Sequence, residues 1–146
     1  MTRRSRRLLT AGLVVAGVVA LDQLTKWLVR REAAELPRRL TSWLSLELVH
    51  NRGISFGTFA QGGAWVVVVV SIVMAVLVVL LFYLGPRYSL PLALILAGSL
   101  GNLIDRLRFG FVWDFVSVPY WPTFNVADAA IACGAIWLGL VVLTAE

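Results

Sequence analysis

The chain has 146 residues, of which 60% are hydrophobic and 14% are charged, with a mean hydropathy of +0.86 and a net charge of +5. A soluble domain is typically about half apolar and a quarter charged, so this composition indicates a membrane protein. The positive charge does not indicate a nucleic-acid partner, because the first basic residues precede an apolar run and are typical of a topology signal facing anionic lipid (Arg3, Arg4, Arg6 and Arg7).

Four apolar segments predict four transmembrane helices, at about residues 8–29, 64–84, 90–105 and 126–143. At about 1.5 Å per residue, segments of roughly 18 to 22 residues cross a hydrocarbon core of about 30 Å. Backbone groups in lipid must bond within their own segment, which makes these spans helical. The third segment is short, so we expect its polar end at the membrane interface. Residues 1–146 are predicted to form a single integral membrane domain.

The first segment has a second interpretation as a cleavable signal peptide, because a basic start and an apolar run end in small residues before Leu21. Three further spans and the polar motif at 22–26 favour a retained helix. Four spans place both termini on one side, and the first arginines favour the cytoplasm. The first long loop is also basic, which counts against this orientation (Arg30, Arg31, Arg38, Arg39 and Arg52).

One membrane face should collect the carboxylates, whichever orientation is correct. The end of the first helix, the start of the second, the end of the third and the start of the fourth all lie at that face. Every aspartate of the chain maps there: Asp22, Asp105, Asp114 and Asp128. Ionisable groups at membrane depth are costly, so this convergence predicts a functional site.

Two loops at the same face have distinct patterns. Residues 43–59 alternate apolar and polar side chains around Asn51-Arg52-Gly53, which predicts a short β-hairpin on the membrane surface. The loop between the third and fourth helices is aromatic, and its rings can be interpreted as an interfacial belt. Within that loop, Pro119 and Pro122 stiffen the chain between Asp114 and the fourth helix.

Several polar residues have a structural interpretation as well as a functional one. Asp22 and Lys26 are four residues apart and could simply pair on one helical face. Asn102 and Asp105 share a face, and Gly98 and Gly101 allow a neighbouring helix to approach closely. Three further residues are most simply interpreted as structural. Arg106 holds a nearby carboxylate or extends to the interface, His50 is not catalytic, and Cys133 is a small buried residue.

The last pair of carboxylates is the most informative. Asn125 is placed to cap the fourth helix, and Asp128 would then occupy its first turn, near the positive end of the helix dipole. Capping does not account for Asp114, which has no basic neighbour in sequence. Two carboxylates at the edge of lipid suggest an acid/base pair that shares one proton, in which one group activates water and the other polarises a carbonyl.

Five motifs in order resemble the lipoprotein signal peptidases, also called signal peptidase II: DQLTK at 22–26, NRGISFG at 51–57, GNLIDR at 101–106, WDF at 113–115 and FNVAD at 124–128. Trp113 departs from the pattern, in which a smaller apolar residue is expected. The resemblance implies an all-α polytopic membrane protein with four helices and a small β-hairpin or cradle at the periplasmic face.

The resemblance further implies an aspartic endopeptidase of the bacterial inner membrane that cuts prolipoproteins before a diacylglyceryl-modified cysteine. It implies no metal or organic cofactor, membrane lipids as partners and a monomer. The catalytic pair would be Asp114 and Asp128. Supporting or substrate-binding residues would be Asp22, Lys26, Asn51, Gly53, Asn102, Asp105, Arg106 and Asn125.

Two other classes of function are alternatives to the peptidase interpretation. A small ion- or proton-coupled transporter would use the aspartates as ligands, although its charges are expected across the midplane and no inverted repeat is evident. A non-enzymatic scaffold would tolerate replacement of Asp114 by Asn.

Overall fold

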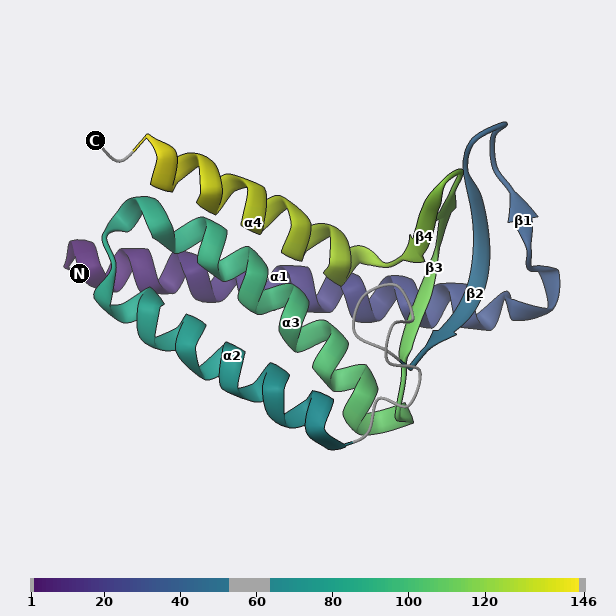
Figure 1. The fold of residues 1–146 in the computed structure, drawn as a ribbon, viewed down its shortest axis with the longest axis horizontal. Coiled ribbons are helices and arrows are strands. Elements are labelled where there is room, and N and C mark those ends of the chain that lie inside the picture. Colours follow the sequence, from purple (N-terminus) through teal and green to yellow (C-terminus); the bar gives the residue numbers. More distant parts are fainter. Residues whose placement is uncertain (1, 53–63, 145–146) are drawn as a thin grey trace.

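The computed structural model describes residues 2–52 and 64–144, which form four long helices and one small sheet (Figure 1). The helices are α1 (Arg3–Arg31), α2 (Ala64–Tyr83), α3 (Ser89–Phe109) and α4 (Val126–Leu143), with short 3-10 turns η1 (Ala33–Glu35) and η2 (Pro86–Tyr88). All four long helices have the length and hydropathy to cross a membrane. Both ends of the chain lie at one end of the bundle, beside the α2–α3 connection, and the sheet lies at the other (Figure 1).

The observed helix bounds differ from the predicted ones at α1 and α3. The first helix begins at Arg3, within the arginine-rich segment, because Thr2 is its N-cap and the Thr2 side chain accepts a hydrogen bond from Ser5 N. The third continues past Asp105 to Phe109 and ends at Gly110, whose φ is 78°. Our prediction of a short third helix was therefore wrong, because Arg106 and Arg108 lower the hydropathy but are good helix formers.

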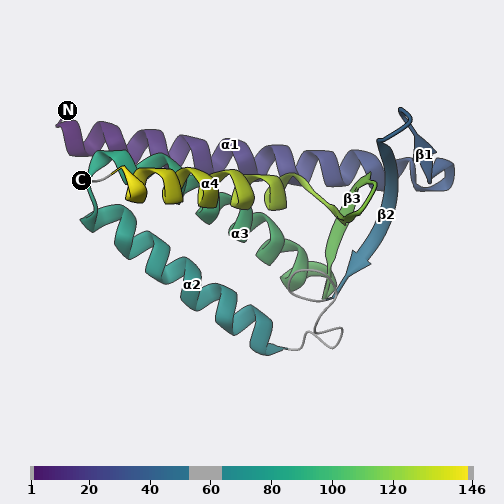
Figure 2. The same ribbon diagram turned by 45° about the horizontal axis from the view of Figure 1, so that its top comes forward.

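Helix α3 packs against α1, α2 and α4 and is the centre of the bundle (Figure 2). Two glycines on α3 make this close packing possible, as predicted. A Cβ on Gly101 would stand 2.7 Å from Asp22 Oδ2, and one on Gly98 would clash with the Ala127 carbonyl oxygen. Large apolar side chains cover the outer surface, as a lipid-facing bundle requires (Val68, Ile72, Val76, Val79 and Ile136, among others).

The four strands form an antiparallel sheet in the order β1 (Arg38–Arg39), β2 (Ser45–Asn51), β3 (Val112–Val118) and β4 (Trp121–Phe124). Strand β2 confirms the first half of the hairpin predicted at 43–59. The predicted return strand, at Ile54 and Phe56, lies outside the described residues. Within the described part of the chain, β2 pairs with β1 and with β3, so its long partner comes from the distant aromatic loop.

The β3–β4 hairpin is absent from our sequence prediction, which placed Asp114 in a loop. Asp114 instead lies on β3, opposite Val49 of β2. The β-branched and aromatic residues of 112–118 carry the strand signal, and Tyr120, with a φ of 63°, makes the turn into β4. The hairpin fixes Asp114 against the start of α4. Strand pairing, rather than the predicted stiffening of a loop by prolines, therefore sets the position of Asp114.

Candidate active site

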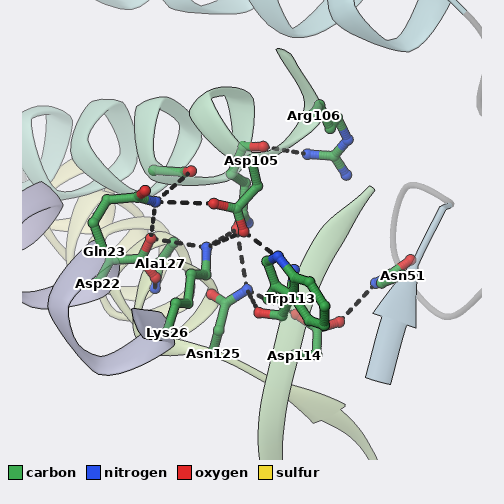
Figure 3. Close-up of polar contacts among 12 residues, drawn as sticks. Asp22, Gln23, Lys26, Asn51, Asp105, Arg106, Trp113, Asp114, Asn125 and Ala127 are labelled. Atoms are coloured by element: carbon green, nitrogen blue, oxygen red, sulfur yellow. Dashed lines mark hydrogen bonds and ion pairs between the residues drawn. The ribbon is translucent and has the colours of Figure 1, made fainter. Parts of the chain in front are cut away.

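The predicted polar residues meet where the sheet joins the helix ends (Figure 3). They come from five elements. Asp22 and Lys26 lie on α1, Asn51 on β2, Asn102, Asp105 and Arg106 on α3, Asp114 on β3 and Asp128 on α4, and Asn125 directly precedes α4. The remaining candidate, Gly53, lies outside the described residues. Convergence of the four aspartates at one end of the bundle is confirmed.

Lys26 is the centre of a buried ion cluster. Its Nζ lies 2.8 Å from Asp22 Oδ2 and 2.9 Å from Asp105 Oδ2, and it donates to Asn102 Oδ1 at 3.2 Å. The three charged side chains are at most 2% exposed. Charges without water need partners, and here two carboxylates share one ammonium group. The local Asp22–Lys26 pair therefore exists, but it is one half of a bridge from α1 to α3.

These two carboxylates also accept hydrogen bonds from further elements. Asp22 Oδ1 accepts from the backbone N of Ala127 at 2.9 Å, which fixes the start of α4. Asp105 Oδ2 accepts from the backbone N of Trp113 at 3.1 Å, which fixes β3. Gln23, which the sequence analysis did not single out, donates to Asp105 Oδ1 at 3.0 Å. Asp22 and Asp105 thus place the two segments that carry Asp128 and Asp114.

Asn125 has the capping role predicted for it and a second role. Its Oδ1 accepts from Asp128 N at 2.9 Å, and Asp128 Oδ2 accepts from Asn125 N at 3.2 Å, which is a reciprocal capping box. Its Nδ2 donates to Asp114 Oδ1 at 2.7 Å and to Asn102 Oδ1 at 3.1 Å. The fully buried Asn125 therefore donates to both candidate carboxyl groups, from its side-chain Nδ2 to Asp114 and from its backbone N to Asp128.

The two carboxyl groups differ in their surroundings. Asp114 is 1% exposed, and its Oδ2 accepts from Asn51 Nδ2 at 2.9 Å, so both its oxygens have amide donors. Asp128 is half-buried, and its Oδ1 accepts from Asn102 Nδ2 at 2.7 Å. Three asparagines from three parts of the chain, Asn51, Asn102 and Asn125, thus hold the pair in a fixed orientation.

Burial raises the pKa of the Asp114 carboxyl to about 7, and the nearby charge of Asp128 adds to this rise. The hydrogen bonds from Asn51 and Asn125 and the charge of Lys26 act in the opposite direction but do not offset it. Asp114 can therefore carry a proton near neutral pH, which an ordinary aspartate does not.

A pocket of about 820 Å³ opens beside the pair. Its polar wall contains both carboxyl groups with Asn51, Asn102 and Arg106, whose guanidinium lies in the field of both aspartates. Much of the remaining lining is apolar and comes from β2, β4 and α4 (Val49, Pro122, Phe124, Ala129, Ile131 and Ala132). The arrangement suits a substrate with one reacting polar bond and a large apolar part.

An aromatic group flanks the pocket. The His50 ring lies 4.4 Å from those of Phe111 and Trp113, and the guanidinium of Arg30 lies 5.0 Å from the Trp113 ring. The large Trp113 side chain is accommodated because it packs in this group while its backbone reaches Asp105. Cys133 is exposed on α4, which corrects the expectation of a buried residue. Among residues 2–52 and 64–144, no cluster of His, Cys, Asp and Glu is arranged to hold a metal ion.

Comparison with known proteins gives a consistent family. Residues 14–144 match the family model described as Signal peptidase (SPase) II. The lipoprotein signal peptidase of Moorella thermoacetica is 43% identical over 127 residues, covering 83% of this chain and 84% of that protein. That of Rhodococcus jostii is 44% identical over 153 residues, covering 95% and 73%. A solved structure described as a bacterial membrane enzyme superposes with a TM-score of 0.80 at 25% identity, covering 94% of each chain.

Proposed function

Because this chain belongs to the signal peptidase II family, it is a membrane peptidase that removes signal peptides from prolipoproteins, and we propose that Asp114 and Asp128 are its catalytic pair. The observation that carries this proposal is that both carboxyl groups line one pocket and accept hydrogen bonds from the same buried residue, Asn125. The family match gives no support to the alternative of a small ion- or proton-coupled transporter.

The chemistry follows from the unequal environments of the pair. Asp128, ionised at the positive end of α4, takes a proton from water, and the water oxygen bonds to the scissile carbonyl carbon. Asp114 gives its proton to the carbonyl oxygen, forming a tetrahedral diol. When the diol collapses, Asp128 protonates the leaving nitrogen, the C–N bond breaks, and a diol hydroxyl returns a proton to Asp114. The pair ends in its starting protonation state.

The remaining residues have positioning or binding roles in this proposal. Asn102 and Asn125 orient the two carboxyl groups, and Asn51 contacts the oxygen of Asp114 that Asn125 does not reach. The Asp22–Lys26–Asp105 cluster positions the backbone of both catalytic segments. Arg106 lines the pocket, where a guanidinium can bind a substrate carbonyl. Gly53, which follows Asn51 and Arg52 closely in sequence, is proposed to contact substrate.

We propose a diacylglyceryl-modified cysteine as the substrate residue after the scissile bond. The apolar wall of the pocket includes Ala129, Ile131 and Ala132 of a membrane-spanning helix, so acyl chains in lipid have direct access to it. Binding of the chains would hold the peptide bond against the aspartates. An otherwise identical precursor with an unmodified cysteine should have a kcat/KM at least about 100-fold lower, or about 2.7 kcal/mol. Equal values would show that only peptide sequence is read.

The protein is a bacterial multi-pass membrane protein, and we infer that it lies in the inner membrane as a monomer with both termini cytoplasmic. The arginines at 3–7 support this orientation. The catalytic pair, at the opposite end of the bundle, would then face the periplasm. The substrate's scissile bond, at the membrane surface, would meet it there.

A gel-shift cleavage assay on a lipidated precursor tests the catalytic assignment. Asp114→Asn and Asp128→Asn should each lower turnover at least about 10³-fold, because such pairs act as a unit. Glu47→Gln, a carboxyl-to-amide change on β2 outside the pocket, is the matched control and should retain activity. Size-exclusion and thermal-unfolding profiles check that the variants are folded. Near-normal turnover in either aspartate variant would refute the assignment.

A further inference from the structure

A second groove lies away from the catalytic pocket, between α1, α2 and α3. It has a volume of about 580 Å³, and every lining residue is apolar. Along α1 the lining residues recur with helical periodicity, so they share one face of that helix: Leu8, Gly12, Val15, Ala16, Val19 and Ala20. The other walls are Leu81 and Phe82 of α2 and Leu96 and Leu100 of α3. On α3 the residues that line the catalytic pocket, Asn102 and Arg106, lie on a different face, so the two pockets are separate.

The dimensions of the groove fit one lipid leaflet. From Leu8 to Ala20 the helix rises about 18 Å at roughly 1.5 Å per residue. Half of a hydrocarbon core of about 30 Å is about 15 Å. Because α1 crosses the membrane from its arginine-rich end, the groove begins at that surface and extends to about the midplane. A single acyl chain has this depth.

The charges at the surface end of the groove are all positive within the described residues. Arg4 is exposed and lies one helical turn before Leu8, on the face that lines the groove. Arg7 donates from Nη2 to the carbonyl oxygen of Leu81 at 2.9 Å, so its guanidinium lies beside the groove wall. Arg3, Arg6 and Arg87 add charge at this end, where residues 2–52 and 64–144 supply no Asp or Glu.

This charge pattern selects among possible occupants. A signal helix has a basic N-terminal region, which five arginines would repel. A second copy of the chain, inserted in the same direction, would bring its own arginines to the same depth. An anionic phospholipid complements the site in both parts, because its acyl chain matches the apolar groove and its phosphate matches the arginines. We propose that the groove binds an acyl chain of an anionic phospholipid whose phosphate lies against Arg4, in the field of Arg7.

Headgroup charge, rather than apolar burial, supplies the selectivity of this site. An acyl chain gains little hydrophobic free energy on moving from bilayer to groove, because both are apolar. A basic side chain near the phosphate favours an anionic over a zwitterionic lipid by about 1 kcal/mol, or about fivefold. Loss of Arg4 should therefore remove most of the selectivity, and filling the groove should remove binding of the chain itself.

Two glycines of α1 provide a matched pair for the test. A Cβ on Gly12 or on Gly17 meets no other atom within 4 Å, so a larger side chain fits at either position. Gly12 lines the groove, and Gly17 does not. Gly12→Leu should block the groove, whereas Gly17→Leu makes the same chemical change outside it. Arg6→Gln is the corresponding control for Arg4→Gln, because Arg6 lies on another face of α1.

Native mass spectrometry of the intact protein, released from detergent, measures the retained lipid. The probes are phosphatidylglycerol and phosphatidylcholine with the same acyl chains. The wild-type protein should retain the anionic lipid at least about fivefold more; Arg4→Gln and Gly12→Leu should each lower its retention about fivefold, and the two controls should not. Equal retention of both lipids, equal effects of Arg4→Gln and Arg6→Gln, or normal retention by Gly12→Leu would each overturn the proposal.

Discussion

The raised pKa of Asp114 makes a quantitative prediction about stability. The carboxyl has a pKa of about 7 in the folded protein, against an ordinary value of 3.8. The folded state therefore holds this proton more tightly than the unfolded state, so its contribution to stability is complete below about pH 4 and is lost as the pH rises through about 7. The difference of about 3 pKa units corresponds to about 4 kcal/mol, of which about 3 kcal/mol is lost between about pH 5 and about pH 8.

Replacing Asp114 by Asn removes this titration and keeps the shape of the side chain. For a chain of about 150 residues, about 3 kcal/mol corresponds to roughly 6–12 °C in Tm. The Tm of Asp114→Asn relative to wild type should rise by that amount between about pH 5 and about pH 8, measured by thermal unfolding in one detergent. The matched variant Glu47→Gln should show no comparable change. A Tm difference that is independent of pH, or that falls at high pH, would refute the reasoning. The charged groups that act on Asp114 are Asp128, Lys26 and Arg106.

Three other predictions follow from the same structure. Lys26→Met should destabilise the protein by about 3–5 kcal/mol in thermal or denaturant unfolding, because it leaves Asp22 and Asp105 buried without a cation; a loss below about 1 kcal/mol would contradict the buried cluster. Cleavage should survive EDTA, because amide donors occupy both oxygens of Asp114; complete loss that added Mg²⁺ or Mn²⁺ restores would favour a metal mechanism. A reporter fused at 85–88 should be cytoplasmic and one inserted at 36–39 periplasmic, and the reverse pattern would place the catalytic face in the cytoplasm.

The helices and the cap of α4 were predictable because their signals are local. Hydropathy alone gave α2 and α4 nearly to the residue, since no charged residue interrupts either helix beyond the first turn of α4. The Asn125–Asp128 capping box was readable from a spacing of three residues. The number of spans then fixed which ends meet, so the convergence of the aspartates followed from connectivity without any knowledge of side-chain contacts.

The sheet and the ion cluster were less predictable because they depend on contacts between distant parts of the chain. Asn51 contacts Asp114 across 63 positions of sequence, and the pairing of β2 with β3 has no local signal. The aromatic residues of β3 fit an interfacial belt as well as a strand, which concealed the hairpin. Lys26 could be paired with Asp22 from helical spacing, but its bond to Asp105 depends on the packing of α1 against α3. Gln23 had no signal beyond its place beside Asp22.

The pH dependence of kcat/KM for a lipidated precursor tests the central claim most directly, namely that Asp114 holds the proton that the pair shares. If a protonated Asp114 polarises the scissile carbonyl, kcat/KM should fall about tenfold per pH unit above its pKa of about 7. The measurement needs one detergent throughout, with substrate binding and folding checked at each pH. A profile that falls on this slope supports the assignment. A kcat/KM that stays level from about pH 7 to about pH 9 would contradict it, because an ionised Asp114 cannot donate a proton.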